Sequence, residues 1–463
     1  MLQIIIPMAG LGTRFTSYGF KTNKYLLPIN IDLQPMIELA ITSLNISDTI
    51  SDPYRKDSNG DKKYFFIINE EEGYNQTLRT LLANICQKYG FKYEIKSVSN
   101  LTEGPACTVA SIRDILDPES PIIVSNSDQV LENWNFRNFI KTCKLYDGCI
   151  LTYEPDYPLE IGSTYKHSFV RFGENGRVVE CREKIVLSKK ALVGVHYFSS
   201  ASLFFNAYDY IVKQNMRAPN GEFYLSLCYQ ALIEMGNTVG VHDIQQGESF
   251  WPVGEPDDYF KYLYNIGGYK HYISLLANNS VLFSNGVSYI KYTKILKGEV
   301  VQNPGLVLLL SGDANINSGS TESRDIKKYE TTNSDIYANS DCEIIIIRSE
   351  DLSYDNTPKI YNISNYTRGW LIGNFSPAIF KTRQFELGLL THNKNEKWDY
   401  HYHAYMGEIN VLLEGNMFIN NRQIHKGEIF YIPENQLTCP NFIEDCKILC
   451  IKVPSIVGDK VCL

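Results

Sequence analysis

The first part of the chain alternates short apolar runs with amphipathic segments. Ile4 to Ile6 and Tyr64 to Ile68 are continuous apolar runs, which are typical of strands buried on both faces of a sheet. Met36 to Leu44 and Tyr74 to Tyr89 carry apolar residues at helical spacing. The polar, turn-rich segment from Ile46 to Lys63 is predicted to be a surface loop. This alternation of strand and helix predicts a doubly wound α/β domain.

The pattern changes in the second part of the chain. Leu306 to Leu310 and Glu343 to Ile347 are apolar runs that predict buried strands within a stretch rich in serine and asparagine. About the last hundred residues show alternating strands joined by short turns. We therefore predict an α/β domain over residues 1–265, a β-rich connecting region of unknown role over 266–365, and a domain of strands over 366–463.

Length, charge and cysteine content limit the classes of protein that this sequence can encode. With 463 residues the chain is long enough for two or three domains. Its formal net charge of −8, without a basic stripe, argues against nucleic acid as a partner. No apolar run reaches membrane-span length and the N-terminus lacks signal-peptide features, so we expect a cytoplasmic protein without a membrane partner. The eleven cysteines include no Cys-x-x-Cys pair, which agrees with reduced thiols in the cytosol.

A loop containing two glycines follows the first apolar run. It consists of Ala9, Gly10, Leu11, Gly12 and Thr13. The backbone N–H groups of its two glycines can face phosphate oxygens without a side chain in the way, and Arg14 and Lys24 add positive charge beside them. The loop lacks the third glycine of a dinucleotide fingerprint and the Gly-Lys-Ser/Thr of a P-loop. A plain turn between strand and helix is the alternative to a phosphate-binding loop.

Two further motifs follow in chain order. Glu103 and Gly104 precede a helical segment, for which a loop and helix cap is the plain interpretation. The apolar run from Pro121 to Val124 is followed by Asp128, which places a carboxylate at the edge of the predicted sheet where ligands of open α/β sheets bind. A single carboxylate suits Mg²⁺, which keeps several waters and takes its other oxygens from substrate phosphates. A turn or cap role for Asp128 is the alternative.

The order of these motifs resembles that of the sugar-1-phosphate nucleotidyltransferase family. The family signature runs Gly-x-Gly-Thr/Ser-Arg and then Pro-Lys-Pro, and in this chain Asn23 and Tyr25 stand in place of the two prolines. The resemblance covers about the first 265 residues. It implies a nucleotide site that contains Ala9, Gly10, Leu11, Gly12, Thr13, Glu103 and Gly104. It implies a catalytic set of Arg14, Lys24, Asp128 and Lys184, with Mg²⁺ on Asp128. It implies sugar contacts from Glu183, Gly194 and Gln129.

The chain departs from the family pattern at two places. Pro252 stands where the family has a second metal-binding aspartate, which leaves Asp257, Glu255 and Asp243 as weak substitutes. Ser168 stands about where many members have a glycine near the sugar. A site with one carboxylate remains compatible with Mg²⁺ held mostly by substrate oxygens.

A second resemblance lies near the C-terminus. His401 and His403, followed by Glu408 and Gly415, have the spacing of the first cupin motif, and alternation along a strand puts both histidines on one face. Thr438 stands where metal-binding cupins place their last histidine. The resemblance implies a cupin-like barrel in which His401, His403 and Glu408 hold a divalent metal. A metal-free sugar epimerase or ketoisomerase with a histidine base, and a purely structural pair, are the alternatives.

The two resemblances together imply an enzyme. It would join a nucleoside triphosphate and a sugar-1-phosphate to give a nucleotide sugar and pyrophosphate, in glycan or surface polysaccharide synthesis. The cupin-like part would isomerise or epimerise the sugar, or form a homo-oligomer. Two alternatives stay open: a cytidylyltransferase that acts on a non-sugar phosphate such as phosphocholine, and a non-catalytic regulator that binds nucleotide and sugar.

Overall fold

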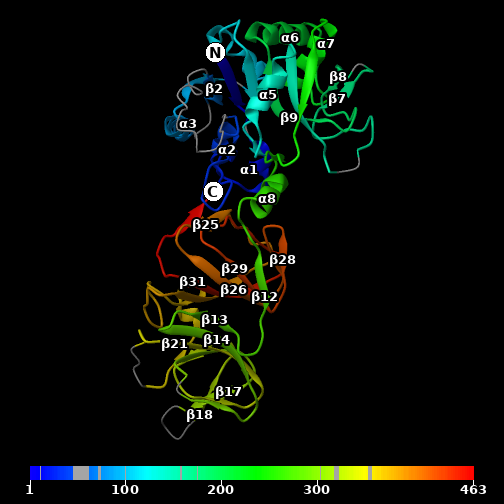
Figure 1. The fold of residues 1–463 in the computed structure, drawn as a ribbon. Helices are drawn as coiled ribbons and strands as arrows, with labels where there is room; N and C mark the ends of the chain where they lie inside the picture. Colours follow the sequence, from blue (N-terminus) through cyan, green and yellow to red (C-terminus); the bar gives the residue numbers. More distant parts are fainter. Residues whose placement is uncertain are drawn as a thin grey trace. The chain divides into compact units, whose positions relative to one another are not determined.

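The chain divides into two compact units, residues 1–267 and 268–463 (Figure 1). The computed structural model describes residues 1–10, 12–44, 62–70, 75–99, 101–156, 159–174, 176–302, 304–317, 323–352 and 357–463. Leu11 and all but the last two residues of the predicted surface loop, 46–63, lie outside the described residues. None of the helices in the described part of the chain has the length and hydrophobicity that crossing a bilayer requires.

A mixed sheet of nine strands forms the centre of the N-terminal unit. Its strands are β1 Leu2–Met8, β2 Lys62–Asn69, β3 Lys92–Val98, β4 Ile122–Ser125, β6 Gly148–Tyr153, β7 Phe169–Phe172, β8 Val178–Arg182, β9 Ala191–Phe198 and β10 Val239–Asp243. Seven of them follow the order β10-β6-β9-β4-β1-β2-β3, and β7 and β8 extend from β9. Strand β1 runs parallel to β2 and β4, so the carboxyl ends of these three strands lie at one edge. Strand β9 is antiparallel to β4 and β6.

Helices cover both faces of this sheet (Figure 1). The helical segments are α1 Thr13–Tyr18, η1 Lys24–Leu26, α2 Met36–Thr42, α3 Asn75–Tyr89, α4 Pro105–Ala110, η2 Arg113–Ile115, α5 Phe136–Cys143, α6 Ala201–Lys213, α7 Leu225–Glu234 and α8 Pro256–Asn265. Ile5 of β1 packs in one apolar cluster with residues of α4, α6 and α7. Ile4 and Ile6 pack in a second cluster with residues of α2, α3 and α5. Both faces of β1 are therefore buried, which explains its continuous apolar run.

A short ribbon beside the sheet carries the chain back to Asp128. Strand β11 (Ser249–Pro252) pairs antiparallel with β5 (Gln129–Glu132), and Pro252 lies opposite Gln129. The N–H of Val253 then donates to the carbonyl oxygen of Asp128 at 3.0 Å. A Cβ atom at Gly254 would lie 2.7 Å from Asp128 Oδ2, so a glycine is needed at this close approach.

The described part of the C-terminal unit consists of strands and short 3₁₀ turns. Its segments are β12 Tyr272–Leu275, β13 Val281–Ser284, β14 Ser288–Ile295, β15 Val300–Val301, β16 Leu306–Ser311, β17 Ala314–Asn317, β18 Ser323–Ile326, β19 Thr331–Thr332, β20 Ile336–Ala338, β21 Cys342–Ser349, β22 Ile360–Tyr361, η3 Ile363–Asn365, η4 Thr367–Gly369, β23 Trp370–Ile372, β24 Glu386–His392, β25 His401–His403, β26 Gly407–Glu414, β27 Met417–Ile419, β28 Arg422–Ile424, β29 Glu428–Ile432, β30 Pro440–Phe442, β31 Cys446–Val453 and β32 Lys460–Cys462. Two six-stranded sheets dominate it, in the orders β13-β14-β21-β16-β19-β22 and β23-β24-β31-β26-β29-β12.

These two sheets are built in the same way, so the unit contains a structural duplication. We call residues 281–361 the first repeat and residues 370–462 the second repeat. The β16–β21 and β26–β31 ladders both shift register at the bulge before a glycine, Gly312 in one and Gly415 in the other. The sequence of β21 with its preceding aspartate, Asp-Cys-Glu-Ile-Ile-Ile-Ile-Arg, is matched in β31 by Asp-Cys-Lys-Ile-Leu-Cys-Ile-Lys. The region without an assigned role in the sequence analysis therefore contains the first repeat.

The two large sheets share one apolar cluster. It contains Ile290, Leu308 and Ile345 of the first repeat together with Val411 and Leu449 of the second. On its other face, the first sheet encloses a separate apolar cluster with the sheet β15-β20-β17-β18. The second sheet has a corresponding cluster with β27, β28 and β30, and a cavity lies on the same side. The cupin assignment of this part stays a prediction.

We expect alanine at either repeat glycine to destabilise the C-terminal unit. Gly312 and Gly415 have φ of +91° and +85°, and a Cβ atom at either would collide with a backbone oxygen and a cysteine Sγ. Each change should lower the free energy of unfolding by about 2 to 4 kcal/mol, combining backbone strain with overpacking. Gly298→Ala is the matched control, because Gly298 has φ of +86° in open space and should lose only about 1 kcal/mol. Denaturant unfolding measures the free energy of unfolding of the three alanine variants. An equal loss in all three would show that the chain relieves the collision at Gly312 and Gly415.

Candidate functional site

A partly buried ion pair lies at the carboxyl edge of the N-terminal sheet. Asp128 follows β4, and Lys24 begins η1, whose N-cap Asn23 accepts a hydrogen bond from the N–H of Tyr25. Lys24 Nζ lies 2.6 Å from Asp128 Oδ2. Burial alone would raise the pKa of Asp128 and lower that of Lys24, but the opposite charges reverse both directions. Asp128 is therefore a carboxylate and Lys24 an ammonium at neutral pH.

Arg14 supplies a second cation beside this pair. It lies in the first turn of α1, and its positive charge helps to lower the pKa of Asp128. Its guanidinium lies 3.4 Å from the Glu255 carboxylate, and the two side chains are 64% and 43% exposed. An ion pair this exposed contributes little to stability. The guanidinium can therefore exchange Glu255 for a phosphate at small energetic loss.

These groups line a cavity of about 310 Å³. Its charged lining residues are Arg14, Lys166, Lys184, Asp128, Glu183, Glu255 and Asp258. Lys166 pairs with Asp258 at 2.6 Å. Sequence reasoning missed Lys166 and Asp258, because neither stands in a recognisable motif and their contact joins distant parts of the chain.

Glu183 and Lys184 enter the cavity beside strand β8. Glu183 is buried and accepts hydrogen bonds from the hydroxyls of Ser168 and, at 2.7 Å, Ser226. Burial raises the pKa of Glu183, and the two serines oppose that effect in part. Lys184 has φ of +60°, an uncommon left-handed conformation, and its Nζ donates to the hydroxyl of Tyr224 at 3.2 Å. Ser168 thus helps to hold Glu183.

Hydrogen bonds between Gln129 and Gly194 join two segments that line the cavity. Gln129 Nε2 donates to the carbonyl of Gly194 at 2.9 Å, and Gln129 Oε1 accepts from its N–H at 3.1 Å. A Cβ atom at Gly194 would overlap the side chain of Asn126. Both residues line the cavity, and these two hydrogen bonds join them to each other. Their predicted contacts with a sugar stay predictions.

The residues predicted to bind nucleotide lie elsewhere. Among the described residues of the first loop, Ala9 is buried, Gly12 has φ of +62°, and only the following Arg14 lines the cavity. Gly10 and Thr13 are exposed, and Leu11 lies outside the described residues. Gly104 has φ of +129° and packs against the backbone of Phe223, while Glu103 pairs with Arg217 at 2.7 Å. Their part in nucleotide binding stays a prediction.

One of the three substitute carboxylates shares the cavity with Asp128. Asp243 is engaged by Thr152 at 2.6 Å and Lys190 at 3.1 Å, and it lines another cavity. Asp257 is exposed in the first turn of α8. Glu255 remains and lines the cavity with Asp128, but Lys24 lies 2.6 Å from Asp128 Oδ2 and Arg14 pairs with Glu255. No group of three or more metal-ligating side chains is found here among the described residues, so Mg²⁺ at Asp128 stays a prediction.

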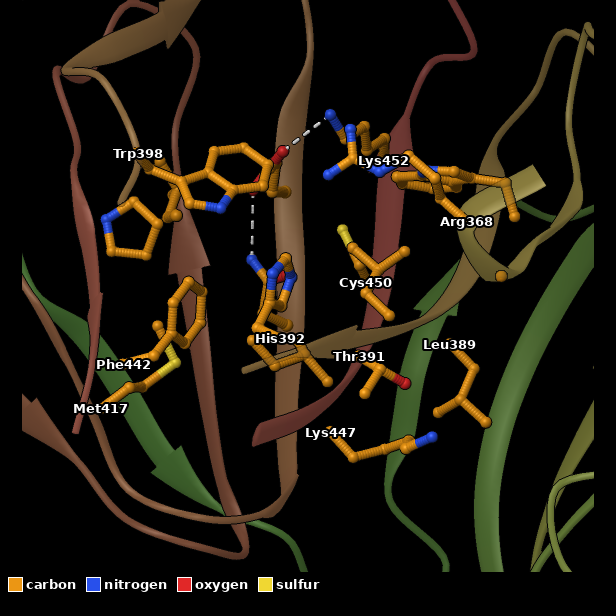
Figure 2. Close-up of a pocket in the computed structure, with 18 of the residues that line it drawn as sticks. Arg368, Leu389, Thr391, His392, Trp398, Met417, Phe442, Lys447, Cys450 and Lys452 are labelled. Atoms are coloured by element: carbon orange, nitrogen blue, oxygen red, sulfur yellow. Dashed lines mark hydrogen bonds and ion pairs between the residues drawn. The ribbon is translucent and has the colours of Figure 1, made fainter. Parts of the chain in front are cut away.

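A second, larger cavity of about 530 Å³ lies in the second repeat (Figure 2). His403 Nε2 lies 3.0 Å from Glu408 Oε1, and Lys452 Nζ lies 2.9 Å from the same oxygen. Lys452 Nζ also lies 3.2 Å from His403 Nε2, so an ammonium fills the space where a metal would contact these two groups. Burial lowers the pKa of His401 to about 4, and Thr438 Oγ1 donates to its carbonyl.

The donor set in this cavity does not fit the predicted metal. The described residues contain no group of three or more His, Cys, Asp or Glu side chains that could hold a metal ion. Burial alone would raise the pKa of Glu408, but Lys452 and His403 hold it well below the usual value. The metal predicted at His401, His403 and Glu408 therefore has no support in the geometry.

Comparison with known proteins gives similarities without a family assignment. No protein-family model matches the chain, and no curated protein matches it. A solved nucleoside-diphosphate-sugar pyrophosphorylase from Vibrio cholerae RC9 is 23% identical, with a TM-score of 0.46, over 56% of this chain and 99% of that chain. A protein described as a glucose-1-phosphate thymidylyltransferase from Bacillus anthracis is 16% identical, with a TM-score of 0.43, over 57% and 94%. The inositol-1-phosphate CTP transferase from T. maritima is 16% identical, with a TM-score of 0.40, over 56% and 94%. Because these TM-scores are low, the similarities establish neither a family nor an activity for this chain.

Two buried histidines should make the N-terminal unit sensitive to acid. Burial lowers the pKa of His196 to about 3 and that of His167 to about 4. In the unfolded chain each titrates near pH 6.5, so between pH 6.5 and pH 4 the unfolded state binds more protons. Stability should therefore fall as the pH is lowered through this window, by about 1.4 kcal/mol per pH unit for each histidine.

Denaturant unfolding at pH 7 and pH 5, followed by far-ultraviolet circular dichroism at 222 nm, measures this dependence. The described α-helices all belong to the N-terminal unit, so the helical signal reports on that unit. His196→Leu should remove one histidine's share of the slope. An unchanged slope in that variant would contradict the assignment.

Proposed function

We propose that the N-terminal unit transfers a nucleotidyl group from a nucleoside triphosphate to the phosphate of a sugar-1-phosphate, releasing pyrophosphate. The observation that carries the proposal is the partly buried Lys24–Asp128 pair next to Arg14, beside a cavity that Arg14, Asp128 and Lys184 line. Two cations, Lys24 and Arg14, next to the Asp128 carboxylate suit a reaction between phosphate groups, in which negative charge must be neutralised and positioned. The order of the motifs along the chain supports the same reaction.

The chemistry requires no strong base. An oxygen of the acceptor phosphate, which is already ionised, attacks the α-phosphorus in line and forms the new P–O bond. The bond from the α-phosphorus to the bridging oxygen of the pyrophosphate breaks, and the pyrophosphate leaves with the electron pair. Catalysis then depends on positioning and charge stabilisation, which fixed cations provide.

Each charged side chain has a separate role in this proposal. Arg14 and Lys24 would stabilise charge on the α-phosphate and the departing pyrophosphate. Lys184 would hold the acceptor phosphate, and Glu183 would accept a hydrogen bond from a sugar hydroxyl. Asp128, with Glu255 beside the same cavity, would hold Mg²⁺, which when bound supplies further neutralisation of the phosphate oxygens.

Pyrophosphate release identifies the substrates. The full chain is incubated with Mg²⁺ and each common nucleoside triphosphate, paired in turn with a panel of sugar-1-phosphates and with phosphocholine, and the product is identified by mass. We expect release with a sugar-1-phosphate and formation of a nucleotide sugar. Release with phosphocholine alone would favour the cytidylyltransferase alternative. Nucleotide binding without release in any pair would favour the regulatory alternative and refute the catalytic role of Asp128.

Arg14→Ala and Asp128→Asn should each lower kcat by at least about a hundredfold, the loss expected when one preorganised charge-stabilising group is removed. Asp128→Asn keeps a hydrogen-bond acceptor for Lys24, which limits damage to the fold. Asp257→Asn is the control, because Asp257 is an exposed carboxylate of α8 that does not line the cavity. Steady-state pyrophosphate release measures the three variants. Near-normal turnover in Arg14→Ala would remove Arg14 from the mechanism.

A further inference from the structure

The two repeats differ most clearly on the face that turns away from the shared apolar cluster. In the first repeat this face is mostly apolar, with the buried Thr293 and Thr332 among its apolar residues. The matched registers of the two sheets identify the equivalent positions in the second repeat. Three positions change from nonpolar to polar between the repeats: Ile295 to His392, Val307 to Asn410, and Gly305 to Glu408. Two change in the opposite direction: Thr293 to Leu390 and Thr332 to Phe430. The three polar residues His392, Asn410 and Glu408 line the 530 Å³ cavity.

Comparing the two repeats shows whether the sheet requires polar residues at these three positions. The first repeat shows that nonpolar residues can occupy these three positions of the sheet. Burying an amide, an imidazole and a carboxylate instead is unfavourable unless each is compensated. Here Glu408 pairs with Lys452, His392 lies 3.2 Å from Glu396, and Asn410 donates to Glu408 at 3.4 Å. The polar set in the second repeat is therefore not required to form the sheet, and a ligand is the simplest reason for it.

The charges around this cavity select an anion. Its charged lining residues are Arg368, Lys447, Lys452, Lys460 and Glu408. Glu408 pairs with Lys452 at 2.9 Å. Within the described part of the chain, neither Arg368 nor Lys460 forms an ion pair with a carboxylate, and both residues are exposed at the cavity. Positive charge is thus in excess here, although the whole chain has a net charge of −8.

The same two cations lie against a flat aromatic side chain. Lys460 Nζ is 3.9 Å from the ring centroid of Trp398, and the Arg368 guanidinium is 5.7 Å from it. Figure 2 shows Trp398, Phe442 and Met417 along one side of the cavity and Lys452 and Arg368 along the other. An apolar face next to cations and buried hydrogen-bonding groups suits a sugar ring, whose C–H face packs on an indole while its hydroxyls reach polar side chains.

We propose that the cavity of the second repeat binds an anionic carbohydrate, meaning a sugar that carries a phosphate or a carboxylate. Arg368 and Lys460 bind the anionic group, Trp398 packs against the ring, and Asn410 and His392 contact hydroxyls. Lys452 and Glu408 compensate each other and hold His403, so no metal is required for binding. The first repeat completes the fold. This site is separate from the proposed nucleotidyl transfer.

Binding is measured by calorimetry on the full chain in a Lys184→Gln background, so that the proposed acceptor site of the N-terminal unit does not contribute. The probes are hexose 1- and 6-phosphates, a hexuronate, the neutral hexose and inorganic phosphate. We expect binding of at least one anionic sugar, with the neutral hexose and inorganic phosphate each at least about tenfold weaker. A sugar phosphate carries a phosphate and a hexuronate carries a carboxylate. Their relative affinities show which of these anionic groups the cavity prefers.

The double variant Arg368→Gln/Lys460→Gln should weaken that binding at least about tenfold. Lys297→Gln/Lys426→Gln removes two charges from exposed lysines that do not line the cavity, and it should change the affinity less than about twofold. Asn410→Val installs the residue of the first repeat and should also weaken binding while the chain stays folded.

Three results would overturn the proposal: no anionic sugar binds, the neutral hexose binds as tightly as its anion, or both double variants behave alike. Pyrophosphate release by Arg368→Gln/Lys460→Gln, measured with Lys184 intact, should equal that of the unaltered chain. The failure of this inference is therefore distinguishable from failure of the proposed transferase activity.

Discussion

A buried carboxylate needs a compensating charge, and both candidate sites of this protein depend on that constraint. Asp128 is held ionised by Lys24 at 2.6 Å, and Glu408 by Lys452 at 2.9 Å. Such pairs add little net stability, because desolvation offsets their attraction, but removing one partner leaves the other charge unpaired. Each pair therefore fixes a charged group at a set place in a cavity, which is what binding or transferring phosphate requires.

Several backbone contacts surround Asp128 of the Lys24–Asp128 pair. Asp128 lies at the end of β4, and the backbone after β11 passes so close that only glycine fits at position 254. Val253 donates to the carbonyl of Asp128, and Glu255 follows directly at the start of α8. Glu255, three residues after Pro252, lines the same cavity as Asp128.

Local patterns predicted the elements better than they predicted the partners. The continuous apolar run of β1 indicated burial on both faces, and the position of Asp128 after a strand indicated its place at the sheet edge. The contact of Lys166 with Asp258 joins residues 92 positions apart and has no local signal. The duplication was also missed. Strands β21 and β31 have similar sequences, but the neighbouring strands differ at polar residues such as Asn410 and His392, so the sequence similarity between the two repeats is weak.

The duplication explains how a polar cavity can exist in a small β unit. The two large sheets bury one shared apolar cluster, so much of the hydrophobic stabilisation is independent of the opposite face of either sheet. In the first repeat that face is covered mostly by apolar side chains. In the second repeat, Asn410 and Glu408 take equivalent positions, and the space beside them is a cavity lined by cations. A unit stabilised by the shared cluster can tolerate polar groups on one outer face, and binding of an anion there would offset their unfavourable burial.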